Sequence, residues 1–445
     1  MKRAHRLLTS IAVVSVVAAA CTASNGSSAT PAATTPSGSP QPVTVNLWAY
    51  WSGRELKEFT AMFDRLHQLE PWITVNVSGG VGDTKIKAAI NSGTPPDVAV
   101  SSDMNNIPNF CSSGAWQDLQ PYLDRDQVDM GQFPPSAVQF TGYGGVQCAM
   151  PFTADSYGLY YNTDMFQKAG IATPPKTWSE LTADAKRLTV FNPDGSIKVA
   201  GFVPWMGFYE TNPVTTGVPA GAAWYGADGK SSLGTDPHWA KLLQWQKALV
   251  DWYGADNLQR FVAGAGNEWG SAQDFQTGRV AMNLDGEWRV AFIQDANPNL
   301  TYATAPFPVP DDATGSYGIG QIALGIVGVP RGAQQTEAAW DVVKYMTTDT
   351  QNLVYLGNVV RNIPTTFAAL QSPDLVAGPQ FQTFLDIYAN PASTYKGTTL
   401  IGSGDVDIFQ QFLERWQSGQ ETNLQQGLER TAAQIDDAVA QASGP

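Results

Sequence analysis

The residues after position 42 alternate between apolar and polar side chains in a way that predicts strands. Residues 43–47 have an apolar side chain at every second position, and strands are also expected over 73–77 and 97–100. A period of two is typical of a strand with one buried face. Between these strands, apolar residues recur at helical spacing over 56–66, and a shorter helix is expected over 83–91. This order of elements predicts parallel strands with right-handed crossovers.

The carboxyl ends of these predicted strands carry side chains that are suited to binding. In open sheets of this kind, ligands bind beyond the carboxyl ends of the strands. The first strand ends near Trp48 and Trp51, and the third ends near Ser102 and Asp103. Aromatic, hydroxyl and carboxylate groups are therefore expected at one edge of the sheet.

The middle of the chain alternates between extended segments and helices. Residues 144–162 predict an extended crossover into a second lobe, and a helix that stops at a glycine is expected over 163–170. Thr177 and Glu180 have the spacing of a capping box, which opens the next helix. A strand is expected over 199–205. These elements predict a second α/β unit after the first.

The last part of the chain is mainly helical. Residues 302–310 predict another extended crossover, and the strand expected over 318–327 returns to the first sheet. Helices are predicted where apolar residues recur at helical spacing, or where a short segment ends at a glycine. The expected helices cover residues 239–249, 271–276, 336–356, 409–416 and 424–439.

One stretch gathers polar and aromatic residues at the end of a strand. Residues 280–284 alternate as a buried strand does, and Asp285 with Gly286 predicts a turn. The turn holds Glu287 and Trp288 beside Asp285. Two interpretations are open: a ligand-contacting cluster, or a strand followed by a turn and a core tryptophan, since buried tryptophan is common.

Composition limits the classes of function. A chain of 445 residues predicts two or three domains. Hydrophobic residues make up 43% and charged residues 15%, which indicates a globular protein with sizeable cores. A formal net charge of −14 argues against nucleic acid and gives no attraction for anionic lipids or ligands. A neutral ligand fits this charge best.

Neither a metal nor a cofactor is expected. Three cysteines and three histidines provide no metal-ligand pattern. The glycine clusters at 142–145 and 315–320 do not follow a nucleotide-binding fingerprint.

The first twenty residues predict an export signal, with a basic start, a short apolar run and small residues before Cys21. A lipoprotein leader needs small residues directly before a cysteine, and residues 22–42 predict a flexible tether rich in Ser, Thr, Ala, Gly and Pro. Cys21 is therefore the predicted lipidation site. The alternative is an ordinary cleaved signal, because residues 18–20 also satisfy an A-x-A cleavage site.

The remaining cysteines are candidates for a disulfide. Three cysteines are an odd number for an exported protein. If Cys21 carries lipid, Cys111 and Cys148 remain, and an oxidising compartment favours their pairing. Two buried free thiols are the alternative.

Several motifs together resemble one known family. These are the leader with Cys21, Leu159–Asn162, Pro175–Leu181, and Phe275–Met282 followed by Gly286-Glu287-Trp288. In this order they resemble the extracellular solute-binding proteins of ABC importers, in particular the carbohydrate-binding family that includes maltose-binding protein. The resemblance covers residues 43 to 440.

The resemblance implies an α/β, two-lobe periplasmic-binding-protein-like fold with crossover hinge segments and a helical C-terminus. The leader then spans residues 1–20, and the lipidated cysteine with its linker spans residues 21–42. Residues 43–150 with 312–362 are expected to form lobe 1. Residues 151–311 with 363–445 are expected to form lobe 2.

The chemistry of a sugar and the resemblance together select candidate ligand-binding residues. Aromatic planes match the C–H faces of a sugar ring, and carboxylates or amides match its hydroxyls. By resemblance, Trp288 stacks on a sugar ring and Asp155 contacts the ligand from a crossover. The predicted ligand-binding residues are Trp48, Trp51, Ser102, Asp103, Asp155, Trp205, Asp285, Glu287, Trp288, Gly320 and Arg361.

The function predicted is that of a lipoprotein on the outer face of the cell membrane. As a monomer, it captures a mono- or oligosaccharide, with amino sugars among the candidates, by hinge closure and delivers it to an ABC permease. One alternative is a glycerophosphodiester as ligand. Another is a secreted glycoside hydrolase that uses two of Asp155, Asp285 and Glu287. No local motif announces a catalytic acid, so the protein is not expected to be an enzyme.

Overall fold

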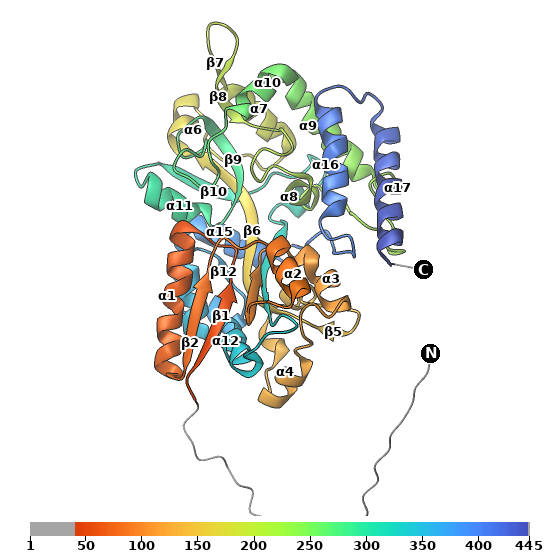
Figure 1. Cartoon of the computed structure of the whole chain (residues 1–445). Helices are drawn as coiled ribbons and strands as arrows, with labels where there is room; N and C mark the ends of the chain where they lie inside the picture. Colours follow the sequence, from red (N-terminus) through yellow and green to blue (C-terminus); the bar gives the residue numbers. More distant parts are fainter. Residues whose placement is uncertain (1–40, 444–445) are drawn as a thin grey trace, which may run out of the picture. The chain divides into compact units, whose positions relative to one another are not determined.

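The computed structural model describes residues 41–443 (Figure 1). The leader predicted over 1–20, the lipidation predicted at Cys21 and the linker up to residue 40 lie outside the described residues. Within the described part, no helix is both long and apolar enough to cross a membrane. The fold is mixed α/β, as the sequence predicts, and it ends in helices.

The N-terminal part has the strand and helix order that its alternation predicts. It contains β1 (Val43–Trp48), α1 (Gly53–Leu69), β2 (Ile73–Ser78), α2 (Asp83–Ser92) and β3 (Val98–Ser101). Strand β1 lies between β2 and β3 and is parallel to both. Helix α1 packs its apolar face, which includes Phe59 and Phe63, into the core. The predicted parallel arrangement is confirmed.

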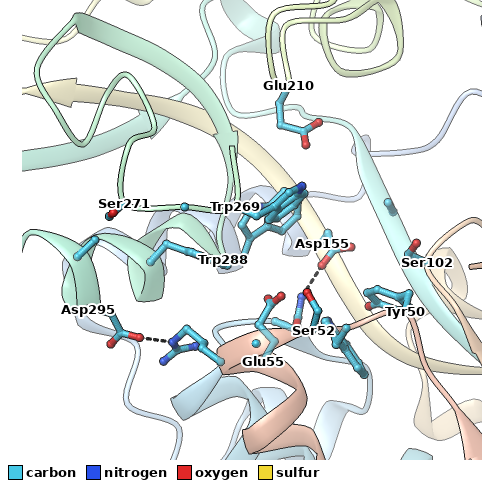
Figure 2. A pocket seen from close by; sticks show the side chains of 18 of the residues that line it. Tyr50, Ser52, Glu55, Ser102, Asp155, Glu210, Trp269, Ser271, Trp288 and Asp295 are labelled. Atoms are coloured by element: carbon cyan, nitrogen blue, oxygen red, sulfur yellow. Dashed lines mark hydrogen bonds and ion pairs between the residues drawn. The ribbon is translucent and has the colours of Figure 1, made fainter. Parts of the chain in front are cut away.

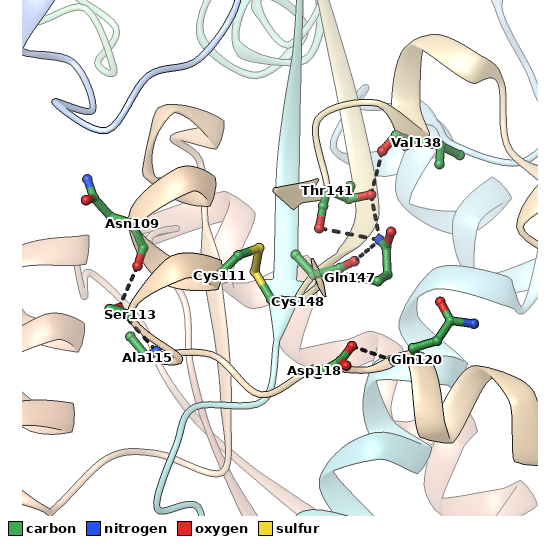
Figure 3. The surroundings of a disulfide bond; sticks show 11 residues. Asn109, Cys111, Ser113, Ala115, Asp118, Gln120, Val138, Thr141, Gln147 and Cys148 are labelled. Carbon is green, nitrogen blue, oxygen red and sulfur yellow. Dashed lines mark hydrogen bonds between the residues drawn. A yellow bond between two sulfur atoms is a disulfide. The ribbon is translucent and has the colours of Figure 1, made fainter. Parts of the chain in front are cut away.

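Short helices and strands follow β3, and a disulfide connects the first α-helix among them to the residue after the last of these strands. They are η1 (Met104–Asn106), α3 (Ile107–Ser112), α4 (Gln120–Asp126), η2 (Met130–Gln132), α5 (Pro135–Val138), β4 (Gly142–Tyr143) and β5 (Val146–Gln147). Cys111 in α3 is bonded to Cys148 after β5, and both residues are buried (Figure 3). The predicted pairing is thus present.

Strand β6 (Met150–Asn162) connects the two parts of the main sheet. Its thirteen residues span roughly 43 Å at 3.3 Å per residue. The order of strands is β2-β1-β3-β11-β6-β9-β8-β7, and both β10 and β12 also pair with β6. In Figure 1, β6 runs from the half of the fold that contains β1 to the half that contains β8. It is the extended crossover predicted over 144–162.

The second part of the fold surrounds β8 and β9. Its elements are α6 (Thr163–Ala169), α7 (Trp178–Leu188), β7 (Val190–Phe191), β8 (Ile197–Phe202), α8 (Pro213–Gly217), α9 (Pro237–Tyr253), α10 (Ala255–Ala263), β9 (Val280–Gly286), α11 (Arg289–Ala296) and β10 (Tyr302–Pro306). The predicted capping box of Thr177 and Glu180 is present at the start of α7. Helix α6 stops at Gly170, as predicted.

The chain then returns to the first sheet and ends in helices. The elements are η3 (Thr314–Ser316), β11 (Ile322–Gly328), α12 (Thr336–Thr348), α13 (Thr350–Val359), β12 (Ile363–Pro364), α14 (Phe367–Leu370), α15 (Gly378–Ala389), α16 (Gly404–Gln417) and α17 (Leu424–Ser443). Strand β11 is antiparallel to β3 and to β6, which confirms the predicted return.

Three clusters of buried apolar residues hold these elements together. The first lies around β1, β3, β6 and β11 and also takes in Phe381 and Phe384 of α15. The second lies around β8 and β9. The third lies between α9, α16 and α17, where Trp239 meets Phe409. The C-terminal helices thus contribute to more than one core.

Two predicted helices differ from the structure. Residues 271–276 form turns and no helix, because Oε1 of Gln273 accepts the N–H groups of Phe275 and Gln276 and so replaces helical bonds. The helix predicted from Thr336 toward Leu356 is two helices. The backbone of Asp349 is extended and its carboxylate caps α13 by accepting the N–H of Asn352 at 2.8 Å.

Removal of the disulfide should destabilise the protein. The double variant Cys111→Ser, Cys148→Ser should lose about 2–4 kcal/mol of unfolding free energy, because the crosslink restricts the unfolded chain. Urea unfolding followed by circular dichroism measures this loss. Reduced wild-type protein is the control and should match the variant. An unchanged unfolding free energy in both samples would contradict a stabilising disulfide.

Candidate functional site

A cavity of about 770 Å³ lies where both parts of the main sheet meet the loops between them (Figure 2). Its walls come from the β1–α1 connection, the end of β3, the middle of β6, the loop before α8, the loop after α10, the β9–α11 junction and the segment after α13. This volume is within the range of small-molecule sites, roughly 300–1,000 Å³.

Aromatic side chains form much of the wall. Tyr157 and Trp288 pack edge to face, with ring centroids 5.6 Å apart, and Trp269 lies 5.9 Å from Trp288. Trp269 is 54% exposed, whereas Trp288 is only 7% exposed, so Trp269 lies at the mouth and Trp288 in the wall. The aromatic residues that line the cavity are Tyr50, Trp51, Tyr157, Trp269, Trp288 and Phe292.

The position of Trp288 depends on Gly286. A Cβ atom at Gly286 would lie 2.3 Å from two carbons of the Trp288 indole. Any larger residue at this position would displace the ring. The glycine two residues before the tryptophan therefore lets the indole fold back over the end of β9, just before α11 begins at Arg289.

Carboxylates outnumber cations in the cavity wall. The charged lining residues are Arg54, Glu55, Asp155, Glu210 and Asp295. Arg54 on α1 forms an ion pair with Asp295 on α11. Within the described chain, the other three carboxyls form no ion pair with Lys or Arg. The cavity is thus acidic, and its one lining cation already has a partner.

Burial raises the pKa of these three carboxyls. The pKa of Glu55 rises to about 7, because desolvation outweighs the nearby positive charge of Arg54. Burial raises the pKa of Glu210 well above its usual value, and the charge of Glu268 raises it further. Burial also raises the pKa of Asp155. Water solvates these groups poorly, and this desolvation disfavours their charged forms.

Asp155 shares a hydrogen-bond donor with a second buried carboxyl. Nδ2 of Asn362 donates to Oδ1 of Asp155 at 2.7 Å and to Oε1 of Glu287 at 3.4 Å. Oε2 of Glu287 accepts the N–H of Ser156 at 2.9 Å. Burial raises the pKa of Glu287, and the charge of Asp155 raises it further. Two adjacent carboxyls repel when both are ionised, so this repulsion adds to the effect of burial on the pKa of Glu287.

A buried ion pair behind the wall fixes the loop that carries Trp269. Nε of Arg289 donates to Oδ2 of Asp285 at 2.7 Å, and both side chains are fully buried. Nη1 of Arg289 donates to the backbone carbonyl of Glu268 at 2.8 Å. Because Glu268 directly precedes Trp269, the ion pair holds that loop against β9 and α11.

Comparison with known proteins identifies the family. A model of the bacterial extracellular solute-binding proteins matches residues 50–353, which is more than half of the chain. This chain belongs to that family.

Individual relatives of this solute-binding protein have low sequence identity to it. It is 28% identical over 288 residues to a presumed binding protein of Brucella abortus; the match covers 62% of this chain and 65% of that protein, just under two thirds of its length. It is 24% identical over 329 residues to a maltooligosaccharide ABC transporter solute-binding lipoprotein of Streptococcus pneumoniae, covering 68% of this chain and 71% of that one.

A solved structure confirms the fold class. The structure of CpMnBP1 with mannotriose bound has a TM-score of 0.79 and 25% identity, and it covers 88% of this chain and 99% of that one. The predicted two-lobe periplasmic-binding-protein-like fold is therefore correct.

Four of the predicted ligand-binding residues line the cavity of this solute-binding protein: Trp51, Ser102, Asp155 and Trp288. Asp103 lines an adjoining hollow of about 280 Å³, which shares Ser102 with the cavity. The carboxylate of Asp103 also caps η1 and accepts a hydrogen bond from Ser403 at 2.9 Å. The structure thus brings these five residues to one region.

Three predicted residues lie behind the cavity or at its edge in buried networks. Asp285 is within β9, not in a turn after it, and is paired with Arg289. Glu287 is fully buried and touches the cavity only through its link to Asn362 and Asp155. The N–H of Gly320 donates to Ser393 at 3.0 Å, and close packing against α15 leaves no room there for a Cβ.

The last three predicted residues lie outside the lining. Trp48 is partly buried beneath Lys85, whose Nζ lies 5.1 Å from its ring. Trp205 lines a separate surface hollow with Arg415. Arg361 has a left-handed backbone, with φ of 74°, and its Nη1 donates to the carbonyl of Val376 at 2.6 Å. Their positions follow from tertiary contacts that strand ends alone do not indicate.

Several lining residues have little or no signal in the sequence. Tyr50 directly precedes the predicted Trp51, and Asn362 directly follows the predicted Arg361, whereas Glu55 lies four residues after Trp51. Glu210 and Trp269 come from irregular loops, and no periodic pattern marks them. Among residues 41–443, no group of three His, Cys, Asp or Glu side chains is arranged to hold a metal ion.

The raised pKa of Glu55 should make stability depend on pH. A folded-state pKa of about 7 exceeds the unfolded value of 4.5, so the folded state binds more protons between these values. The contribution is fully present below pH 4.5 and is lost as pH rises through 7. Glu55→Gln should therefore raise the unfolding free energy at pH 8 by roughly 1–2 kcal/mol but not at pH 4.5.

Urea unfolding at both pH values measures this difference. Glu414→Gln, on the exposed face of α16, is the matched control and should change neither value. Equal effects of Glu55→Gln at both pH values would contradict the raised pKa.

Proposed function

We propose that this solute-binding protein captures a sugar in the 770 Å³ cavity and presents it to the permease of an ABC importer. The observation that carries the proposal is the composition of the wall. Flat aromatic faces of Trp269, Trp288 and Tyr157 lie next to carboxylate and amide groups. This pairing matches a ring with apolar C–H faces and a rim of hydroxyls.

The known relatives support a sugar as the ligand class. The structure compared above holds mannotriose, and the Streptococcus pneumoniae relative is described as a maltooligosaccharide-binding lipoprotein. The first shares the fold of this chain, and the second aligns with 68% of it. The family fold does not specify the particular saccharide, because many of the lining side chains come from loops.

The binding step is hinge closure. The wall includes Tyr50 and Trp51 from the first core and Tyr157 from the edge of the second. A ligand that contacts both sides binds the closed form better and shifts the open–closed equilibrium by that difference in affinity. Residues 43–150 with 312–362 and residues 151–311 with 363–445 are the lobes in this proposal. The permease recognises the closed form.

The wall disfavours the two alternatives. A glycerophosphodiester needs a cation for its phosphate, but the only lining cation in the described chain, Arg54, is paired with Asp295. The glycoside hydrolase considered from the sequence uses two of Asp155, Asp285 and Glu287 at the scissile bond. Glu287 is fully buried, and Asp285 is held by Arg289. Binding without cleavage is therefore the proposed activity.

Titration with saccharides tests the proposal. Intrinsic tryptophan fluorescence of the purified protein should shift saturably with one ligand class from a panel of mono- and oligosaccharides, amino sugars and glycerophosphodiesters. The bound ligand, released by denaturation and analysed by mass spectrometry, should be intact. Flat titrations across the panel would contradict sugar binding, and recovery of cleaved sugar would establish a hydrolase.

Substitution of the cavity tryptophans should weaken that binding. Trp269→Ala should raise Kd by roughly five- to tenfold, because loss of one aromatic contact is worth about 1–1.4 kcal/mol. Trp288→Ala should have at least this effect. Trp252→Ala is the matched control, since Trp252 is also exposed but lies on α9 outside the cavity. Isothermal titration calorimetry measures all three; equal Kd values would remove the tryptophans from the site.

The protein is proposed to be an exported monomer, held at the outer face of the membrane by lipid on Cys21. The tether then raises its effective concentration near the permease. Cys21→Ala should move the protein from the membrane fraction to the soluble fraction, as measured by fractionation and immunoblotting. Continued anchoring of the variant would contradict lipidation at Cys21.

A further inference from the structure

The charge of the cavity is unbalanced in a way that a neutral sugar does not explain. Glu55, Asp155 and Glu210 come from α1, β6 and the loop before α8, and their carboxyl groups point into the same space (Figure 2). None of the three pairs with a cation in the described chain. A neutral ligand would exclude water from three carboxyls without supplying a compensating charge.

Buried polar atoms beside these carboxyls also lack partners. Asn362 is 5% exposed, and its Nδ2 donates to Asp155 and Glu287, which fixes the orientation of the amide. Oδ1 of Asn362 has no hydrogen-bond partner among the described residues. Trp288 is 7% exposed, and its Nε1 likewise has none. Both residues line the cavity, and their unpartnered atoms are buried in its wall.

Among the charged and amide groups that line the cavity, acceptors predominate, whereas the lining hydroxyls of Ser and Tyr residues can both donate and accept. Three carboxyls and Oδ1 of Asn362 accept hydrogen bonds when the carboxyls are ionised. An ammonium group supplies three donors and no acceptor, whereas a sugar hydroxyl supplies only one donor. Charge-assisted hydrogen bonds are roughly twice as strong as neutral ones. The faces of Tyr157 and Trp269 also attract a cation.

We propose that the ligand is an amine-bearing saccharide whose free ammonium group is held among Glu55, Asp155 and Glu210, with Oδ1 of Asn362 as a further acceptor. This inference rests on the proposed function and names the substrate class of the same cavity. The sugar ring packs against Trp269 and Trp288.

Binding of an ammonium group releases protons from the cavity. Burial raises the pKa of Glu55 to about 7 and also raises the pKa of Asp155 and of Glu210. A cation beside these groups favours their ionised forms. The other titratable or charged groups that face or back the site are Tyr50, Arg54, Tyr157, Glu268, Asp285, Glu287, Arg289 and Asp295.

Matched pairs of sugars test the inference. The pairs are glucosamine with glucose, mannosamine with mannose, and the β-1,4-linked glucosamine disaccharide with cellobiose. In at least one pair, the amine should bind roughly tenfold or more tightly, as measured by calorimetry at pH 6.5. Calorimetry in two buffers of different ionisation enthalpy should show proton release with the amine.

Isosteric variants locate the ammonium site. Glu55→Gln and Glu210→Gln should each reduce the preference for the amine severalfold and change the affinity for its neutral partner less. Glu414→Gln, outside the cavity, should leave both affinities unchanged.

The outcomes of these titrations distinguish failure of the ammonium inference from failure of sugar binding. Equal affinity within every pair that binds would overturn the ammonium inference and leave sugar binding intact. Tight binding of a simple primary amine, with no gain from the sugar ring, would overturn the saccharide part. Absence of binding by every amine and neutral member, and by the wider panel, would overturn both proposals.

Discussion

Continuous pairing along β6 is the constraint on which the site depends. At Thr153 and Ala154 this strand is flanked by β11 and β12, and at residues 158–161 it is flanked by β9 and β10. The change of partners occurs at its middle, where Ser156 pairs with Ile322 and Tyr157 pairs with Gly286. One strand thus belongs to both parts of the main sheet.

The cavity lies at this change of partners. Asp155 and Tyr157 are two residues apart, so their side chains project from the same face of the strand. Asp155 and Tyr157 each pair with one neighbouring strand, and the strand is paired on both sides at Ala154 and Gly158, which holds this short segment in place. Asn362, in the segment after α13, then ties Asp155 to Glu287. A movement of the two parts of the fold must bend this region or rearrange these hydrogen bonds.

The sequence predicted the frame of the fold better than the contents of the site. Strands β1 to β3, the crossover β6, the return of β11 and the capping box of α7 all follow from local periodicity, which depends on neighbouring residues. Trp51 and Ser102, which line the cavity, were predicted because they lie at strand ends, where ligands bind in such sheets. Asp155, which also lines it, was predicted from the family resemblance. Trp288 was found from its turn and from the family resemblance.

The remaining site residues depend on contacts between distant segments. Glu210 and Trp269 lie on irregular loops, and the loop of Trp269 is positioned by Arg289, twenty residues later. The sequence places Asp285 and Glu287 in a turn, where carboxylates are expected to be exposed. In the structure, however, Asp285 forms a buried ion pair with Arg289, and the backbone N–H of Ser156 in β6 donates to Glu287. No local pattern distinguishes such buried acids from ligand-contacting ones.

The central claim is that a single ligand bridges elements from both parts of the fold. Hydrogen–deuterium exchange, with and without the tightest saccharide from the panel, measures this directly. Closure on one ligand should slow exchange at the same time in residues 50–55, in residues 268–271 and in the segment around Asn362. Protection confined to one of these segments, or to the surface hollow near Trp205, would contradict closure of the two parts on one ligand.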